Sequence, residues 1–396
     1  MRTTPLTLDL KAFGDDIDNL RAELKQDIGD KDLDQFRKIE MLVWALSFLG
    51  IATAGFGVNP IAIMALAAAS FARWTIISHH ISHRGYENIP GAPARYNSKA
   101  YGRGWRRIIH WLDWMQPEAW HHEHDVLHHY NLGENADPDV PQYKSEWMKE
   151  SGIPVPLRFV LVAIIAMVWK PFYYAPNTLN ALLNKEEKTS IEFTSAGLWS
   201  PFGKRFWQIV WRCWLPYISF RFVALPAVFL LISPEAWASA LINILIAEVV
   251  INLWTYIVIA PNHAGSDIYV FDEHHKGRAT FYLHQIVGSV DYNCGGNTKD
   301  FMQGWLNYQI EHHLFPELTV RQYQKAHSRV REICAKYDIP VVSESVFKRV
   351  VKLTRILTGI DTQPLWPGVI DSSKVEHQDA VVENNSKEQL NNTATV

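Results

Sequence analysis

The chain has 396 residues, of which 48% are hydrophobic, and a formal net charge of −3 at pH 7. This nearly balanced charge indicates no particular partner, and we expect no nucleic-acid binding. The three cysteines, Cys213, Cys294 and Cys334, are too few and too scattered for a disulfide framework or a zinc ribbon, which fits a reducing compartment.

The apolar residues are gathered in blocks. Residues 1–40 are charged and lack the apolar core of a signal peptide, so we expect a cytoplasmic N-terminal segment. Residues 41–58 and 59–78 form a nearly continuous apolar hairpin, and residues 213–232 and 236–260 form a second one. A helix needs about 20 apolar residues to cross roughly 30 Å of hydrocarbon. The pattern therefore predicts four transmembrane helices in two hairpins.

Two arginines interrupt these blocks. An arginine at the centre of a bilayer costs about 2.5 to 3.5 kcal/mol on insertion scales. Arg73 lies near the end of its block, where its side chain can reach the interface, whereas Arg221 lies nearer the middle and needs a partner. We expect Glu248 on the next span to be that partner.

A fifth apolar run, residues 156–174, is cut short by Lys170-Pro171, and we expect it to lie in the membrane interface. Topology supports this interpretation. If His129 and His263 share one site, they lie on the same side of the membrane, so an even number of crossings must separate them. The two spans of the second hairpin satisfy that condition, and a third span would not.

Basic residues indicate the orientation. Arg37 and Lys38 precede the first span, and both hairpin turns lack Lys and Arg. A larger basic group follows the second span: Arg84, Arg95, Lys99, Arg103, Arg106 and Arg107. By the positive-inside rule, the polar segments and both termini are cytoplasmic. We therefore expect an all-α, multi-pass integral membrane protein with a helical cytoplasmic cap, a main domain over residues 41–340, a C-terminal cytoplasmic extension over 341–370 and a disordered tail over 371–396.

Histidines form three clusters beside the apolar segments, at residues 79–83, 124–129 and 309–313. A spacing of four residues, as between His79 and His83, puts two imidazoles on one helical face. Neutral imidazole is the commonest side-chain metal ligand, and nitrogen donors without a matching cysteine set suit iron, copper or zinc. The clusters predict a polynuclear metal site at the membrane surface.

Several other residues are weaker candidates. His263 follows the last span at the side and depth needed to complete the site, and His284 is a weaker choice. His121 and His122 could share the ligand face of the second cluster. Four carboxylates could orient imidazoles or could be ordinary solvated acids: Asp125, Asp137, Asp139 and Glu311. Five histidines are assigned no role: His110, His274, His275, His327 and His377.

These motifs resemble the membrane-bound fatty-acid desaturases that carry a glutamine in the third histidine box. The resemblance covers roughly residues 41–340. Box one is residues 79–83, box two is followed by Asn131 and Asp137-Pro138-Asp139, and box three lies within residues 305–316. Gln-x-x-His-His followed by Leu-Phe-Pro is typical of front-end desaturases and of related bacterial acyl desaturases.

The resemblance implies a non-haem di-iron centre that uses O2 to remove two hydrogens from adjacent acyl carbons. The implied iron ligands are eight histidines: His79, His83, His124, His128, His129, His263, His312 and His313. Gln309 would occupy the position that is histidine in other desaturases, and it joins all of these histidines except His263 in the implied catalytic set.

The chain departs from the family pattern in two respects. Box one has His80 where many front-end enzymes have aspartate, so His80 could be a ligand or only a hydrogen-bonding residue. The fused cytochrome b5 domain of the family is missing, so we expect electrons from a separate protein of the ferredoxin or cytochrome b5 type. The basic residues between Arg84 and Arg107 could be its docking surface or ordinary positive-inside anchors.

The implied function is an O2-dependent acyl-lipid or acyl-thioester desaturase that inserts a cis double bond into a fatty-acyl chain. An unactivated methylene has no acidic proton for a general base, so the oxidising chemistry must come from the metal cofactor, while an apolar tunnel would position the chain. A di-iron hydroxylase or ketolase acting on a lipid would use the same boxes. A membrane metal transporter is the alternative outside enzymes, but it would place ionisable residues along its spans.

Overall fold

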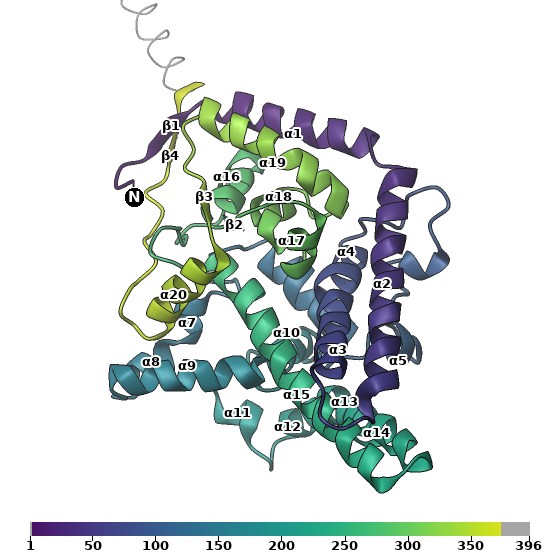
Figure 1. Ribbon diagram of the computed structural model, residues 1–396. Coiled ribbons are helices and arrows are strands. Elements are labelled where there is room, and N and C mark those ends of the chain that lie inside the picture. Colours follow the sequence, from purple (N-terminus) through teal and green to yellow (C-terminus); the bar gives the residue numbers. More distant parts are fainter. Residues whose placement is uncertain (1, 374–396) are drawn as a thin grey trace, which may run out of the picture.

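The computed structural model describes residues 2–373, and over this range the chain is mostly helical, as predicted (Figure 1). Four strands of three residues each pair in parallel, β1 with β4 and β2 with β3. Their bounds are Leu6–Leu8 for β1, Val290–Tyr292 for β2, Val342–Glu344 for β3 and Val369–Asp371 for β4. From residue 374 on, the predicted tail lies outside the described residues, as does His377.

Three long helices form the apolar framework: α2 (Asp30–Ala54), α3 (Pro60–Ala72) and α15 (Pro234–Ile259). They pack against one another (Figure 1). Asn59 caps α3 by accepting a hydrogen bond from a backbone amide of its first turn. The side chain of Asn243 in α15 donates to backbone carbonyls at the end of α2 and in the turn that follows it. One polar side chain thus ties α15 to the α2–α3 hairpin.

Four helical stretches are long and apolar enough to cross a membrane: Pro60–Ser82, Val155–Glu187, Lys204–Leu231 and Pro234–His263. They indicate a membrane protein, and three of them coincide with predicted spans. The predicted span over residues 41–58 is not among them. It lies on α2, where the charged residues Arg37, Lys38 and Glu40 precede its apolar part. The fourth stretch that is long and apolar enough to span is Val155–Glu187, which contains residues 156–174.

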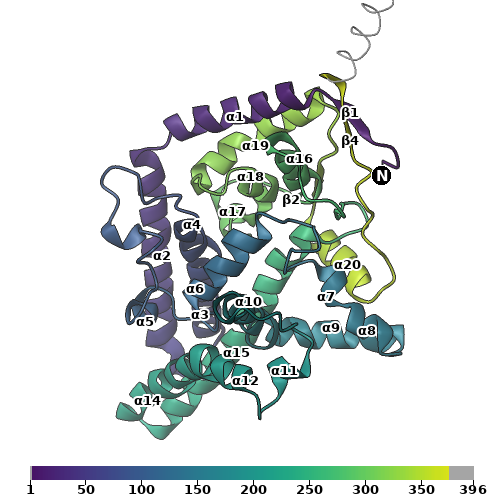
Figure 2. The ribbon, with the colours of Figure 1, turned by 180° about the vertical axis from the view of Figure 1, so that it is seen from behind.

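Helix α9 (Val155–Trp169) does not stop at the Lys170-Pro171 pair. The chain passes through a π-helical turn at Lys170–Tyr174 and continues as α10 (Ala175–Glu187). Proline has no N–H to donate, and the widened turn accommodates it where the helix resumes after the kink. In both views α9 runs across the direction of α2 and α3 (Figures 1 and 2). Helix α10 packs against α6 (Pro117–Trp120), beside the second histidine box.

The remaining helices are shorter or lie in the polar part of the fold. Their bounds are α1 Leu10–Gln26, α4 His79–Ser82, α5 Arg106–His110, α7 Pro141–Lys144, α8 Glu146–Glu150, α11 Ala196–Trp199, α12 Lys204–Ile209, α13 Leu215–Ile218, α14 Leu225–Ala227, α16 Arg278–Val287, α17 Asn297–Met302, α18 Gln309–Leu314, α19 Val320–Lys336 and α20 Val346–Leu357. Helix α1 packs on α16 and α19 with its buried face, which includes Phe13, Ile17 and Leu20. These helices cover the upper end of the framework in Figure 1.

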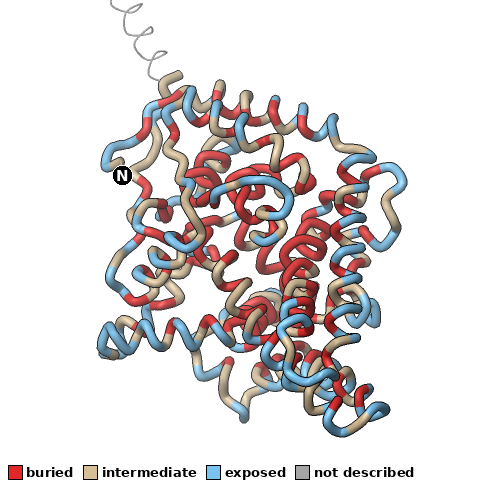
Figure 3. The backbone as a smooth tube through the Cα atoms, in the orientation of Figure 1, coloured by how far each residue is buried: buried red, intermediate tan, exposed pale blue. Residues whose placement is uncertain are grey.

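Large hydrophobic side chains are exposed on one part of the molecule. They gather on α2, on α9 and over residues 202–249, where Phe48 is 76% and Leu231 is 89% exposed. Buried residues instead concentrate in the centre of the fold (Figure 3). Apolar surface of this extent is unfavourable in water, so a membrane is the environment that accounts for it.

The two arginines of the apolar blocks have different surroundings. Arg73 donates to two backbone carbonyls at the end of α5, which satisfies its guanidinium at the edge of the block. The predicted pair between Arg221 and Glu248 is wrong. Trp114 and Tyr217 donate to the two oxygens of Glu248, and Nε and Nη2 of Arg221 have no hydrogen-bond partner within the described residues. These two donors lie closer to Glu248 and fill both of its oxygens.

Candidate metal centre

Box one lies where α3 widens into a π-helical turn (Arg73–Ser78) and continues as α4. Nδ1 of His79 donates to the backbone carbonyl of Thr75 at 3.2 Å, so its Nε2 is free to face the interior. Gly304 packs against this turn with φ +65°, and a Cβ there would lie 2.7 Å from Oγ1 of Thr75. Only glycine allows this close approach of the box-three loop to box one.

Box two is itself a π-helical segment, His121–His128. The amide of His129 donates to the carbonyl five residues back, that of His124, at 3.1 Å. This wider turn brings His124 and His129, which are five residues apart, onto one face, whereas His128 is directed toward other partners. The ring of Trp120 stacks on His124 with centroids 4.6 Å apart and holds that imidazole in place. π-Helical turns of this kind occur frequently at functional sites.

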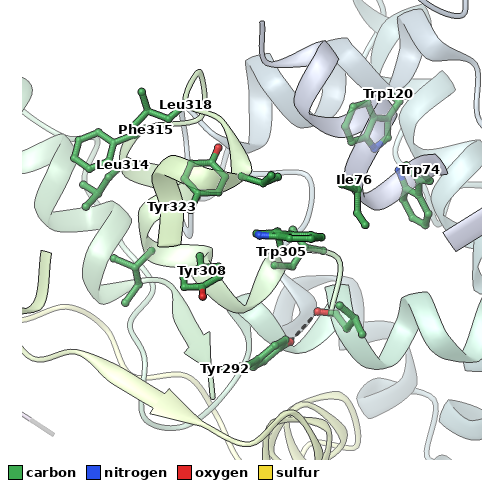
Figure 4. Packing of buried hydrophobic residues seen from close by; sticks show 14 of the residues in the cluster. Trp74, Ile76, Trp120, Tyr292, Trp305, Tyr308, Leu314, Phe315, Leu318 and Tyr323 are labelled. Carbon is green, nitrogen blue, oxygen red and sulfur yellow. Dashed lines mark hydrogen bonds between the residues drawn. The ribbon is translucent and has the colours of Figure 1, made fainter. Parts of the chain in front are cut away.

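Box three forms α18, all six residues of which are buried. Nδ1 of His313 donates to Oε1 of Gln285 on α16 at 2.8 Å, and Nδ1 of His312 lies 3.2 Å from the Tyr323 hydroxyl on α19. Figure 4 shows the aromatic residues that pack around this segment, with Trp305 facing Ile76 of the first box region. The third box is therefore held by helices that follow it and precede it in the chain.

Two groups of imidazoles result from this packing. The first consists of His79, His83, His124, His129 and His312, and the second of His128, His263 and His313. Within each group the ligand atoms all lie within 4.8 Å of one another. All eight predicted ligands thus fall into two groups. The first takes two histidines from box one, two from box two and one from box three, and the second takes one each from boxes two and three together with His263.

The second group includes the predicted glutamine at its edge. Nε2 of Gln309 lies 2.9 Å from Nε2 of His263, and Oε1 of Gln309 accepts from the Asn262 side chain at 2.8 Å. Nδ1 of His263 donates to the backbone carbonyl of Gly288 at 3.1 Å. Gln309 therefore contacts a candidate ligand directly, and Asn262 orients its amide.

Several ring nitrogens of the two groups lack the hydrogen-bond partners that buried imidazoles need, and a bound metal ion would supply a partner for them. Buried ring nitrogens without a hydrogen-bond partner include Nε2 of His83, His312 and His313 and both nitrogens of His129. Nε2 of His79 and Nε2 of His124 face each other at 2.9 Å. Five candidate ligands outside the apolar stretches have a pKa well below the usual range for histidine, because they are buried and lie next to other imidazoles. They are His83, His124, His129, His312 and His313. These rings are therefore neutral, the form that binds metal.

His128 differs from these histidines. Burial opposes its charged form, but the adjacent Asp137 outweighs burial and raises the pKa of His128. Oδ1 of Asp137 accepts from Nδ1 of His128 at 2.9 Å, and two backbone amides donate to the same carboxylate. A carboxylate that accepts the second ring N–H of a ligand fixes its tautomer and raises its basicity. Asp137 is placed for the orienting role proposed from the sequence.

The other three acidic candidates lie differently. Asp125 contacts His121 and lies 3.3 Å from Nε2 of His83, so it reaches one candidate ligand. Burial raises the pKa of Asp139, which lies beside Glu123 and contacts no ligand imidazole through a hydrogen bond. Oε1 of Glu311 contacts Nδ1 of His327, on the side of α18 away from the histidine groups. The partners that orient most ligands are backbone carbonyls and neutral side chains, whose sequence signal is weak.

The residues whose roles the sequence left open lie outside both groups. Nδ1 of His80 donates to the backbone carbonyl of Ile76 at 2.7 Å, as an internal helix contact. His121 contacts the Asp125 carboxylate, and His122 is buried beside the second box. His284 lies apart, stacked on a phenylalanine ring of a different loop.

A cavity of about 510 Å³ extends from the two histidine groups. His79 and His124 of the first group and His128 and His263 of the second line it, together with Gln309. Aromatic side chains make up much of the remaining wall: Trp74, Trp120, Trp169, Tyr173, Phe193 and Trp199. Most of the cavity wall is apolar, and members of both histidine groups contribute to it.

One buried ion pair near this cavity has no counterpart in the sequence analysis. Nζ of Lys170 lies 2.7 Å from Oδ2 of Asp113, and the lysine side chain is fully buried. The ammonium also lies over the ring of Trp74, 4.7 Å from its centroid. The pair joins the π-helical turn after α9 to the loop that precedes the second box. The charge of Lys170 marked a break in an apolar run, but nothing in the sequence identified its partner.

Fold and site together define a helical membrane protein with two buried histidine groups, each of which could hold a metal ion. The chain belongs to the fatty acid desaturase family, because the family model described as fatty acid desaturase matches residues 54–345, most of the chain.

Several curated relatives share parts of this sequence. The NADPH-dependent stearoyl-CoA 9-desaturase of Mycobacterium tuberculosis is 34% identical over 142 residues, which cover 35% of this chain and 33% of that protein. The Delta(5) fatty acid desaturase A of Dictyostelium discoideum is 25% identical over 240 residues, 56% of this chain and 47% of that protein. The Delta(8)-fatty-acid desaturase of Helianthus annuus is 32% identical over 114 residues, 29% and 23% of the two chains. The chain thus matches between about a quarter and a half of the length of these relatives.

Proposed function

We propose that the chain is an O2-dependent acyl desaturase that inserts a cis double bond into a fatty-acyl chain, with one iron ion in each histidine group. The observation that carries this proposal is the apolar cavity whose wall includes members of both groups. Family membership and the names of the relatives support it. Those relatives are named for positions 9, 5 and 8, so their names assign no position to this chain.

The cavity accounts for substrate binding in physical terms. Binding is stabilised by about 0.8 kcal/mol for each methylene of an acyl chain that leaves water, and most of the cavity wall is apolar. Trp74 and Trp169 would confine the chain from one side, and Tyr256 lines the wall as well. Bound iron, with O2, would supply the oxidising power that side chains lack. The protein supplies the ligands, a dry site and the position of the carbon pair.

Gln309 has a distinct role in this proposal. Its amide contacts Nε2 of His263 where other desaturases are expected to have an imidazole, so it would adjust the second metal position without adding a strong base. Asn262 holds the amide oxygen, which leaves the amide nitrogen directed at His263. The acyl carrier, whether a lipid or a thioester, is not distinguished by these contacts.

We infer that both termini and the histidine boxes are cytoplasmic and that α9 lies in the membrane interface. Two features support this placement of α9: its direction across α2 and α3 (Figure 1), and the packing of α10 beside the second box. The division into residues 1–40, 41–340 and 341–370 remains part of the same proposal. The two-hairpin arrangement follows if α2 crosses the membrane with α3.

Turnover also needs an electron source. Removing two hydrogens from the chain while O2 is reduced to two waters takes up two further electrons and two protons, so we propose a separate ferredoxin or cytochrome b5 type donor. The basic segment after box one is partly neutralised: Arg95 pairs with Glu40, and Arg103 lies 3.4 Å from Glu118. Those pairs favour the anchoring interpretation for these two arginines.

Product analysis tests the proposed function. The chain would be expressed in a host with a compatible electron donor, and new double bonds would be located by mass spectrometry of derivatised fatty acids. We expect one new cis double bond at a fixed position. A hydroxylated or keto product in place of an alkene would identify the hydroxylase or ketolase alternative.

A matched pair of variants tests the cavity. Ile165 on α9 lines it, whereas the neighbouring Ile164 is 48% exposed and does not. Ile165→Trp should reduce turnover at least tenfold or shift the preferred chain length, because the larger side chain occupies the acyl path. Ile164→Trp should retain wild-type activity. Equal activity in both variants would show that the substrate does not use this cavity.

A further inference from the structure

A third histidine cluster lies outside the two groups of the proposed iron site. Its members are Glu134, which follows the second box, His274 and His275 in the loop after β-bridged Phe271, and His284 on α16. Ligand atoms of Glu134, His274 and His275 lie within 4.8 Å of one another. His274 and His275 lie in a charged loop, an ordinary place for histidines, so the sequence alone indicates no role for them.

The carboxylate of Glu134 is the centre of this cluster. Its Oε2 accepts from Nδ1 of His274 at 2.7 Å, and its Oε1 accepts from the backbone amide of His275 at 3.4 Å. Nδ1 of His284 lies 3.8 Å from the same Oε1. Three imidazoles from two elements thus surround one carboxylate that is almost completely buried.

Two imidazoles of the cluster, those of His275 and His284, have ring nitrogens without a hydrogen-bond partner. His284 is 9% exposed, and its Nδ1 is buried without a hydrogen-bond partner. Both ring nitrogens of His275 are likewise buried and unpartnered. The ring of His284 is held by stacking on Phe271, with centroids 3.7 Å apart. A buried ring nitrogen without a partner carries a desolvation cost that a bound cation would remove.

The pKa directions agree with the geometry. Burial lowers the pKa of His284 to about 3 and lowers that of His275, so both rings are neutral at pH 7 and have a lone pair available. Three imidazoles and one carboxylate are a donor set that zinc accepts in tetrahedral geometry. With metal–ligand distances of about 2.0 to 2.2 Å, small side-chain rotations would bring the four donors onto one ion.

A second acidic and histidine cluster shows what a filled site of this kind looks like. Asp291, Glu311 and His327 also have ligand atoms within 4.8 Å of one another. There, however, the guanidinium of Arg331 donates to Asp291 at 3.2 Å and to Nε2 of His327 at 3.1 Å. That cluster holds its own cation. No lysine or arginine side chain forms an ion pair or hydrogen bond with Glu134 within the described residues.

We propose that Glu134, His274, His275 and His284 bind a divalent first-row metal ion, with zinc as the matching chemistry, at a site separate from the two histidine groups. Its position indicates a structural function. Glu134 lies three residues before Asp137, the residue that orients His128, and His284 precedes Gln285, the residue that orients His313. A metal ion here would fasten two segments that hold ligands of the second group.

Metal analysis of the full-length protein in detergent tests this proposal. Iron and zinc would be counted by mass spectrometry after zinc is added to the purified protein and excess is removed. We expect one zinc ion per chain that His275→Ala and His284→Ala each reduce to less than a tenth, while their iron content stays at the wild-type level. Glu134→Gln, which keeps the side-chain shape, should weaken zinc binding at least tenfold in a calorimetric titration.

A matched control and a stability readout sharpen the test. His110→Ala removes an imidazole that belongs to none of the clusters, so it should leave zinc binding unchanged. Zinc should raise the Tm of the wild type and of His110→Ala, but not that of His274→Ala, whose side chain is half exposed and tolerates truncation.

Three results would overturn the proposal. These are wild-type protein that takes up no zinc at micromolar concentrations, zinc binding that survives all four substitutions, or iron lost in parallel with zinc from His275→Ala and His284→Ala. The zinc lost on substitution of a cluster residue is measured without turnover, so failure of the desaturase proposal would leave this result unaffected.

Discussion

At the scale of single residues, the site depends on imidazoles that are oriented by hydrogen bonds from their second ring nitrogen. Nδ1 of His79 contacts a carbonyl, that of His128 a carboxylate and that of His313 an amide oxygen. Each contact leaves Nε2 directed into the group. Ring orientation, rather than the number of histidines, therefore decides which of them can bind metal.

The first prediction concerns the two groups. His312→Ala and His128→Ala each remove one donor from a different group, so each should lower iron content and abolish turnover while the fold survives. His80→Ala should retain most of the iron, because His80 lies outside both groups and contacts a helix carbonyl. Iron content by mass spectrometry and unfolding by circular dichroism provide the readouts. Full iron occupancy in both group variants would contradict the proposed ligand set.

The second prediction concerns Gln309. Gln309→Ala leaves Nε2 of His263 and the Asn262 amide without their partner, so we expect turnover to fall by about 10-fold to 100-fold, the range typical of residues that support metal ligands. Gln309→His should keep iron but change the rate. Steady-state turnover and iron content would be measured together. Near-normal turnover in Gln309→Ala would show that Gln309 only packs against its neighbours and does not support the site.

At the scale of elements, polar contacts attach the apolar helices to the histidine boxes. The Lys170–Asp113 pair ties the end of α9 to the loop before box two, and Glu317 ties the end of box three to α1. Both contacts join segments far apart in the chain. Their loss should affect stability before it affects metal ligation.

The third prediction tests the buried pair. Lys170→Met leaves the Asp113 carboxylate buried without a cation, which should destabilise the protein by about 3 to 5 kcal/mol. The double variant Lys170→Met with Asp113→Leu should recover much of this loss, because an apolar pair has no charge to desolvate. Lys185→Met on the adjacent helix α10, where the side chain is exposed, serves as the control. Unfolding in detergent, followed by circular dichroism, measures the difference, and equal stability of Lys170→Met and wild type would refute it.

The fourth prediction concerns pH. Burial opposes the charged form of Glu317, but hydrogen bonds from Arg21 and Lys25, both at 2.7 Å, outweigh burial and lower its pKa. A carboxylate with a lowered folded-state pKa stabilises the fold above its unfolded-state pKa, and that contribution is lost as pH falls through the folded-state pKa. Between about pH 5 and pH 3, the Tm of the wild type should therefore fall more steeply than that of Glu317→Gln. Parallel Tm profiles would show that the contact does not couple to pH.

At the scale of the whole molecule, an apolar surface on α2, α9 and residues 202–249 lies below a polar layer built from α1 and α16–α19 (Figure 1). The candidate metal centre lies between the two. This arrangement suits the proposed function, in which an acyl substrate would reach the centre from the apolar side and an electron donor would dock on the polar side.

The fifth prediction is topological. If α9 lies in the interface, Lys144→Cys and Lys185→Cys must be accessible from the same side of the membrane, together with both termini. Labelling of intact and opened vesicles with an impermeant thiol reagent, in a background with Cys294 replaced by Ser, measures this accessibility. Labelling from opposite sides would make residues 155–187 a true span and change the number of crossings.

The sequence by itself determined the class of protein and identified the histidines that the structure brings together in two groups. Spacing along a helix, as between His79 and His83, is a local property, so it does not depend on how the rest of the chain packs. The same holds for three of the four apolar stretches and for the Gln-x-x-His-His motif of α18. The membrane span expected at residues 41–58 was less secure, because charged residues and apolar residues share α2.

Only the tertiary structure decided how the histidines are divided. His128 and His129 are neighbours in sequence yet belong to different groups, because adjacent residues of a helix point in different directions and meet different partners. The orienting residues Gln285 and Tyr323, the Lys170–Asp113 pair and the cluster around Glu134 all join segments distant in sequence. Contacts of this kind depend on the packing of whole helices. Local sequence patterns therefore do not indicate which distant side chain a given residue will contact.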